Sequence, residues 1–96
     1  MFDLITIGDS VIDTFVPLKE AEVSLIKGQR MLSVRFGDKV GTDPLFSLVG
    51  GNAANSAVGG ARLKLKTATY TNIGNDHDKH LILTQFKENK VDWNRI

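Results

Sequence analysis

The chain has 96 residues, and its twelve Lys and Arg against eleven Asp and Glu leave a formal net charge of +1. This length suits one small domain, and the near-neutral charge argues against generic binding to nucleic acid or anionic lipid. The sequence has no apolar run of membrane-spanning length and no Cys, which excludes disulfides and thiolate zinc sites. With no signal-type segment at its start, it is predicted to be a cytoplasmic protein without a membrane partner.

The first predicted element is a strand over residues 2–8, FDLITIG, which carries apolar residues on both alternating faces. That pattern is typical of a central parallel strand covered on both sides. The run breaks at GDS, residues 8–10, and a second β-rich segment follows over residues 11–16. Asp13 therefore lies just beyond the first strand. Because open α/β sheets bind ligands at their carboxyl edge, Asp13 is a candidate ligand-binding residue.

A β excursion is expected next, with strand-like runs over residues 23–27 and 30–36. The Gly28-Gln29 pair between them favours a hairpin with a type II′ turn. The second run places three apolar side chains on one face, those of Leu32, Val34 and Phe36. This apolar side is expected to fold over a site or to pair with another chain. The charged residues of the excursion, including Arg35, are better explained as its solvated side than as an anion site.

A returning strand over residues 45–49 leads into the stretch VGGNAANSAVGGARLK, and a helix is predicted over residues 52–63. The inward positions of this helix recur at three- and four-residue steps and are small, namely Ala54, Ala57, Val58 and Ala61. Gly59 and Gly60 inside it should each cost about 1 kcal/mol relative to Ala. Close packing of another element against bare backbone is the simplest explanation of that cost.

The rest of the chain predicts a strand over residues 67–73, a helix from 76 or 77 to about 90, and a strand beginning in residues 91–96. Asn75 or Asp76 is expected to cap this second helix. Its inward face is formed by Ile82, Leu83 and Phe86. The order of strand, β excursion, helix, strand and helix indicates an α/β fold with a Rossmann-like parallel sheet and a right-handed crossover.

The two glycines before the first helix suggest a ligand site. Gly50-Gly51 at a strand-to-helix junction is expected to leave backbone N–H groups uncovered near the positive end of the helix dipole. Asn52 and Asn55 lie three residues apart, and their amides both donate and accept, which suits hydroxyl groups better than phosphate. The alternative is a glycine-rich turn with Asn52 as a simple helix cap, and spacing alone slightly favours it. No nucleotide-binding glycine motif is formed.

Two histidines of the second helix, His77 and His80, lie beside Asp76 and Asp78. Histidines at an exposed helix start are usually solvated, so no metal site is predicted.

The run VGGNAANSAVGGARLK resembles the first signature of the ribokinase family, the PfkB-type carbohydrate kinases, whose members phosphorylate sugars, nucleosides and related hydroxyl compounds with ATP. ITIGDSVID resembles the first strand of that family followed by its substrate-binding Asp, and TATYTNIGND resembles the strand that ends in a Gly-Asp-type turn. The three segments stand in family order. The resemblance covers nearly the whole chain and implies a partial ribokinase-like fold.

Carried over by position, the resemblance implies that Asp13 accepts hydrogen bonds from substrate hydroxyls, with Gly51 and Asn55 lining the same pocket. Gly50 and Gly51 would act as a hinge for a lid formed by residues 17–49. In the family this lid excludes water from the substrate and often forms the contact of a homodimer. Asn52 occupies a position that varies within the family.

The sequence also departs from the family pattern, for example at Lys79, where the family turn often has Gly. Family helices of this type usually end in Arg-Leu-Gly, whereas Arg62 and Leu63 are followed here by Lys64. The second family signature, a Gly-Ala-Gly-Asp-type segment that supplies the catalytic base and an anion hole, has no match in this sequence. No catalytic residue is therefore predicted, and the ATP and Mg²⁺ of the full-length enzyme are not expected to bind fully to this chain.

The resemblance thus predicts the substrate-binding N-terminal part, residues 1–96, of an ATP-dependent carbohydrate kinase that acts on a sugar or nucleoside. Two alternatives remain from the residues themselves, a noncatalytic module that dimerises through the lid and a small polyol-binding protein.

Overall fold

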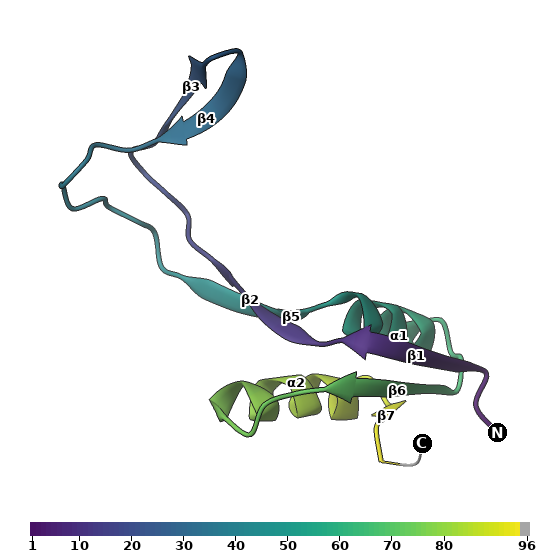
Figure 1. The fold of residues 1–96 in the computed structure, drawn as a ribbon. Helices are drawn as coiled ribbons and strands as arrows, with labels where there is room; N and C mark the ends of the chain where they lie inside the picture. The colour runs from purple at the N-terminus through teal and green to yellow at the C-terminus, as the bar shows by residue number, and fades with distance from the viewer. Residues whose placement is uncertain (95–96) are drawn as a thin grey trace. The chain divides into compact units, whose positions relative to one another are not determined.

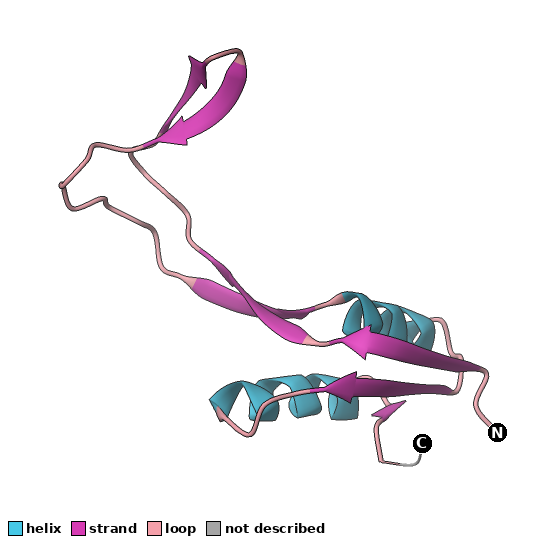
Figure 2. Cartoon of the chain, in the orientation of Figure 1, coloured by secondary structure: helices cyan, strands magenta, loops and turns pink. Residues whose placement is uncertain are grey.

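The computed structural model describes residues 1–94, which form a small mixed α/β protein (Figure 1). Figure 2 shows the same chain coloured by helix, strand and loop. The chain divides into two compact units. The first comprises residues 1–13 and the described residues from 47 onward, and the second is Thr14–Phe46. Of the strand predicted within residues 91–96, residues 95 and 96 lie outside the described part.

The first unit is built on a three-stranded sheet in the order β1 (Leu4–Asp9), β6 (Thr67–Asn72) and β7 (Val91–Asp92). Both pairings are parallel, with Leu4 opposite Thr67 at the start of the first. The predicted parallel sheet is therefore confirmed. The prediction that the first strand lies centrally is wrong for this sheet, because β6 takes the middle position and β1 an edge.

Both helices contribute to one hydrophobic core on a single face of this sheet. They are α1 (Asn52–Arg62) and α2 (His77–Glu88), close to the predicted ranges. The hydroxyl group of Thr6 donates to the carbonyl oxygen of Ala53 at 2.9 Å, which places α1 over the Thr6 face of β1. The buried core consists of Ala54, Ala57, Val58, Ile82, Phe86 and Val91.

Large side chains on the opposite face of the sheet are exposed. Strand alternation directs Ile5 and Ile7 away from Thr6, and they are 48% and 77% exposed, with Tyr70 beside them at 59%. The prediction that the first strand is covered on both sides is therefore wrong for the described residues, since both helices pack on one face.

Close packing explains one of the two glycines inside α1. A Cβ on Gly60 would lie 2.5 Å from the Leu4 side chain and 3.3 Å from the Thr67 hydroxyl oxygen, so this glycine admits close packing against the sheet. A Cβ on Gly59 would meet nothing within 4 Å. Close packing thus explains Gly60, whereas the structure gives no packing reason for Gly59.

Each helix is followed, two residues after its end, by a lysine in the left-handed backbone conformation. After α1, the Leu65 N–H donates to the Gly60 carbonyl at 3.1 Å and the Lys64 N–H to the Ala61 carbonyl at 3.0 Å, which is a Schellman motif. Lys64 has a φ of 71° and Lys90, after α2, a φ of 61°. A side chain in this conformation costs about 1 to 2 kcal/mol, which glycine avoids.

The start of α2 is capped as predicted. The carboxylate of Asp76 accepts a hydrogen bond from the Lys79 N–H at 3.2 Å, so Asp76 rather than Asn75 is the N-cap. This bond satisfies one of the free amide groups of the first turn.

The second unit contains an antiparallel hairpin of β3 (Glu22–Ile26) and β4 (Gln29–Ser33). Its turn residues are Lys27 and Gly28, with φ values of 49° and 79°. Two positive φ angles define a type I′ turn, so the predicted type II′ turn at Gly28-Gln29 is wrong. Lys27 occupies the first turn position in the left-handed conformation, and Gly28 occupies the second. β4 ends at Ser33, whereas the sequence predicted a strand that continues to residue 36.

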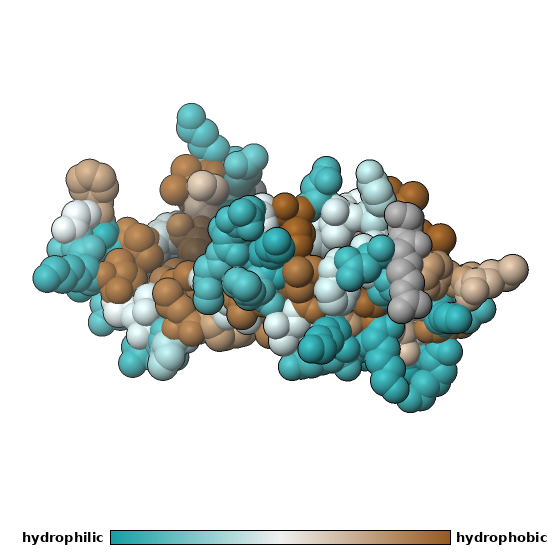
Figure 3. Space-filling view, turned by 90° about the horizontal axis from the view of Figure 1, so that it is seen from below, coloured by the Kyte–Doolittle hydropathy of each residue, from teal (hydrophilic) through white to brown (hydrophobic). Residues whose placement is uncertain are grey.

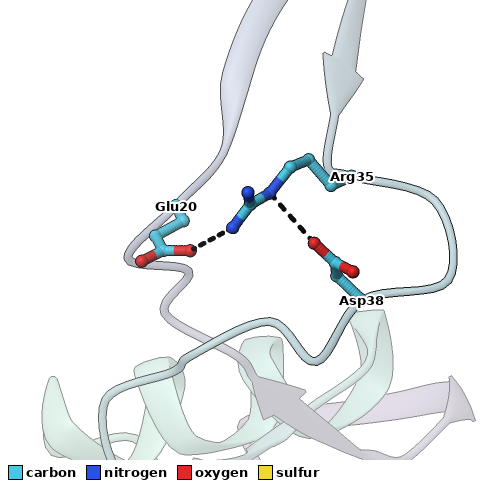
Figure 4. A network of polar contacts seen from close by, with 3 residues as sticks. All are labelled: Glu20, Arg35 and Asp38. Carbon is cyan, nitrogen blue, oxygen red and sulfur yellow. Dashed lines mark ion pairs between the residues drawn. The ribbon is translucent and has the colours of Figure 1, made fainter.

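Ion pairs bind segments of the second unit together. Figure 4 shows Arg35 between two carboxylates, Asp38 at 3.1 Å and Glu20 at 3.8 Å. Lys19 pairs with Asp43 at 3.3 Å. All these groups are solvated, so each pair contributes at most about 1 kcal/mol. Arg35 is engaged within the unit, in agreement with its interpretation as part of a solvated side.

Hydrophobic side chains reach the surface at many places, interleaved with hydrophilic ones (Figure 3). On one face of the hairpin, Val23, Leu25 and Leu32 are 71%, 74% and 67% exposed, and Val23 lies directly opposite Leu32. Among residues 1–94, no helix has the length and apolar character needed to cross a membrane.

Candidate functional site

Two short strands bring Asp13 to the glycine pair. β2 (Val11–Phe15) and β5 (Phe46–Gly50) form a two-stranded sheet. A Cβ on Gly50 would collide with the carboxylate group of Asp13. The Gly50 position is buried and Asp13 is exposed. The missing side chain at position 50 therefore makes room for a carboxylate that remains open to solvent.

Gly51 joins β5 to α1 through a backbone conformation that favours glycine, with a φ of 95°. A Cβ at this position would lie 2.6 Å from the carbonyl oxygen of Asp9 and 3.0 Å from the Cα of Ser10. The bend thus packs directly against the backbone that follows β1. Positive φ and lack of space together require glycine here.

Asp9 holds the start of α1. Its carboxylate accepts a hydrogen bond from the Asn52 N–H at 3.0 Å. The expectation that the amide groups of this helix start are uncovered is therefore wrong for Asn52. A carboxylate next to the positive end of the helix dipole is favourable, and it replaces the acidic residue that the first turn of α1 lacks.

The sequence prediction missed the roles of Asp9 and Ser10. Ser10 is buried, and its hydroxyl oxygen accepts from the Thr71 hydroxyl at 2.9 Å, which ties the ends of β1 and β6 together. The available signal was the polar break immediately after a predicted strand, because polar side chains at that edge of a sheet face the following helix start.

Asn52 and Asn55 occupy different environments. Gly51 is the N-cap without a side-chain cap bond, and Asn52 is the first helical residue, so the simple alternative of Asn52 as helix cap is wrong. Asn55 lines an open hollow of about 600 Å³ together with Ile12 and residues of α2 such as His80.

The structure therefore brings together Asp13, Gly50 and the Gly51-Asn52 bend, with Asn55 one helical turn further on. Within residues 1–94, no hydrogen bond joins the side chains of Asp13 and Asn55. Ile12 faces the hollow that Asn55 lines, and strand alternation directs Asp13 to the other side of β2. A ligand that contacts both Asp13 and Asn55 would have to reach from one side of β2 to the other.

The site does not fit the phosphate groups of ATP. The Asn52 N–H already binds the Asp9 carboxylate, and that negative charge would repel a phosphate at the helix start. In the described part of the chain, no three or more His, Cys, Asp or Glu side chains gather as metal ligands. Hydroxyl groups match the exposed carboxylate and amide groups better.

Comparison with protein-family models and with curated proteins finds no match. The fold is similar to the crystal structure of Sa239, with a TM-score of 0.74 and 22% sequence identity over 98% of this chain. The match covers 27% of the Sa239 chain, so the present sequence spans little more than a quarter of that protein's length. At this identity the similarity shows a shared α/β fold.

Proposed function

We propose that this chain is the substrate-binding, amino-terminal part of a ribokinase-like carbohydrate kinase that transfers phosphate from ATP to a hydroxyl group of a sugar or nucleoside. The observation that carries the proposal is the exposed Asp13 carboxylate lying against Gly50, where a Cβ would force this carboxylate to move. The resemblance of three segments in family order supports the same function. The match to only 27% of the Sa239 chain is consistent with a chain that forms part of a larger fold.

In this proposal Asp13 accepts hydrogen bonds from substrate hydroxyl groups, since an ionised carboxylate is a strong acceptor with two oxygens. Gly50 and Gly51 let the substrate approach the backbone and form the hinge of a lid made by residues 17–49. The amide groups of Asn52 and Asn55 bind further hydroxyls. The ATP that reacts with the substrate, and its Mg²⁺, are held by other parts of the full-length enzyme, because the residues at the start of α1 do not fit phosphate.

Ligand-dependent thermal stability tests this function. We expect at least one of D-ribose, D-fructose and adenosine to raise the melting temperature of the 96-residue chain in a saturable manner. At about 100 times its Kd, a ligand stabilises by roughly 2.7 kcal/mol. Asp13→Asn should abolish the response, whereas Asp78→Asn, at an exposed carboxylate in α2, should retain it. If the unmodified chain responds to none of these compounds, the proposal fails.

A second candidate function is homodimerisation through the hairpin, favoured by the exposed apolar face of Val23, Leu25 and Leu32. We expect light scattering to give the mass of a dimer and the triple change of these residues to Thr to give a monomer. Met31→Thr is the control, because Met31 lies on the other face of the hairpin. The same mass for the triple variant and the unmodified chain would exclude this surface.

A further inference from the structure

The end of the sheet opposite the candidate site carries a second hollow, of about 480 Å³, and most of its lining residues are charged. It lies where β1 and β6 begin and where both helices end. Its charged lining residues come from three chain segments and are Asp3, Arg62, Lys64, Lys66, Glu88 and Lys90. Four cations thus face two carboxylates, which makes this hollow much more positive than the chain as a whole.

The four cations are available to a ligand. The ion pairs within residues 1–94 involve Lys19 and Arg35, both in the second unit, and none involves a cation of the hollow. One of the two carboxylates is already engaged, because Asp3 accepts a hydrogen bond from the Lys66 N–H at 2.8 Å. The backbone N–H groups of Lys64 and Leu65 donate to α1, so the ligand-binding groups here are side chains.

One of the four cations is held by a side-chain hydrogen bond, and all four residues are exposed. The Nε of Arg62 donates to the Asn89 side-chain oxygen at 3.0 Å, and the Asn89 amide donates to the Gln85 carbonyl at 2.8 Å, which orients the guanidinium group between the helices. Lys64 and Lys90 both occupy left-handed positions that glycine would fill without strain. Backbone strain of this kind is concentrated at functional sites.

Favourable interaction of cations with the helix C-terminal dipoles explains one lysine at each helix end. It does not explain Lys66, which precedes β6 and lines the same hollow. We propose that this hollow is a binding site for a compact oligophosphate, either free or as the phosphate chain of a nucleotide. Ammonium and guanidinium groups bind phosphate oxygens strongly, and the volume is that of a small-ligand site.

The test is a calorimetric titration of the 96-residue chain with inorganic tripolyphosphate at low ionic strength. We expect saturable binding that the double change Lys64→Gly and Lys90→Gly weakens at least about tenfold. These changes relieve backbone strain, so the melting temperature should not fall and lost binding cannot be attributed to unfolding. Lys27→Gly removes a third left-handed lysine, in the hairpin turn, and should leave the affinity within about twofold.

Absence of saturable binding to the unmodified chain would overturn the proposal, as would equal affinity in the double variant or an equal loss with Lys27→Gly. A titration with ATP distinguishes the two sources of the phosphate chain. If ATP binds the unmodified chain and the double variant binds it weakly, the ligand is a nucleotide. If the unmodified chain binds tripolyphosphate but not ATP, the ligand is the free anion. Asp13→Asn should not change either titration, which separates this site from the proposed sugar site.

Discussion

Gly51→Ala is expected to lower the free energy of unfolding by roughly 3 kcal/mol or more, because two penalties combine at this position. The backbone has a φ of 95°, which an alanine adopts only with strain. The added Cβ would also lie 2.6 Å from the Asp9 carbonyl oxygen, and backbone atoms cannot move aside as a flexible side chain can. The bend, the Asp9 bond to Asn52 and the placement of Gly50 should all be disturbed.

Gly59→Ala is the matched control for this prediction. Gly59 lies inside α1, and an added Cβ would meet no atom within 4 Å, so alanine should stabilise the helix by about 1 kcal/mol. Urea unfolding of the two variants measures both effects. A Gly51→Ala protein as stable as the unmodified chain would show that the bend is not constrained as described.

Phe86→Ala is expected to cost about 3 to 5 kcal/mol, which is a large share of the stability of a domain this small. Phe86 is fully buried at the centre of the core that joins the two helices to β7. Its ring lies 6.5 Å from the ring of Trp93, the single tryptophan of the chain, so tryptophan fluorescence reports its loss directly.

Leu81→Ala provides the comparison on the same helix. Leu81 is 41% exposed, so its replacement should cost much less, at about 1 kcal/mol or below. Denaturant titration followed by fluorescence gives both values. Equal losses for the two variants would contradict the assigned core.

Most of the secondary structure could be predicted from the sequence because it depends on local periodicity. The predicted inward residues of both helices recur at helical spacing. Most of them are buried, and Ala61 and Leu83 are partly buried against the same core. The cap Asp76 depends on a residue three positions away and was also predictable. The hairpin turn was not, because Lys27 adopts a backbone conformation that its residue type disfavours.

Features that depend on distant partners were the ones missed. Apolar residues on both faces of the first strand predicted cover on both sides, yet the helices pack on one face and leave Ile7 exposed. The bond of Asp9 joins residues 43 positions apart, so no local pattern reveals it. The sequence placed Asp13 and the glycines in one pocket through resemblance, but the steric match of Gly50 with the carboxylate depends on the pairing of β2 with β5.

Backbone amide shifts in an NMR titration test the proposed polyol site most directly. Titration of the 96-residue chain with D-ribose, D-fructose and adenosine should shift the amide signals of Asp13, Gly50, Gly51, Asn52 and Asn55 together and saturably for at least one compound. Those shifts should be lost in Asp13→Asn while the remaining spectrum stays folded. Saturable shifts confined to other parts of the chain, or no shifts with any of the three compounds, would contradict the site.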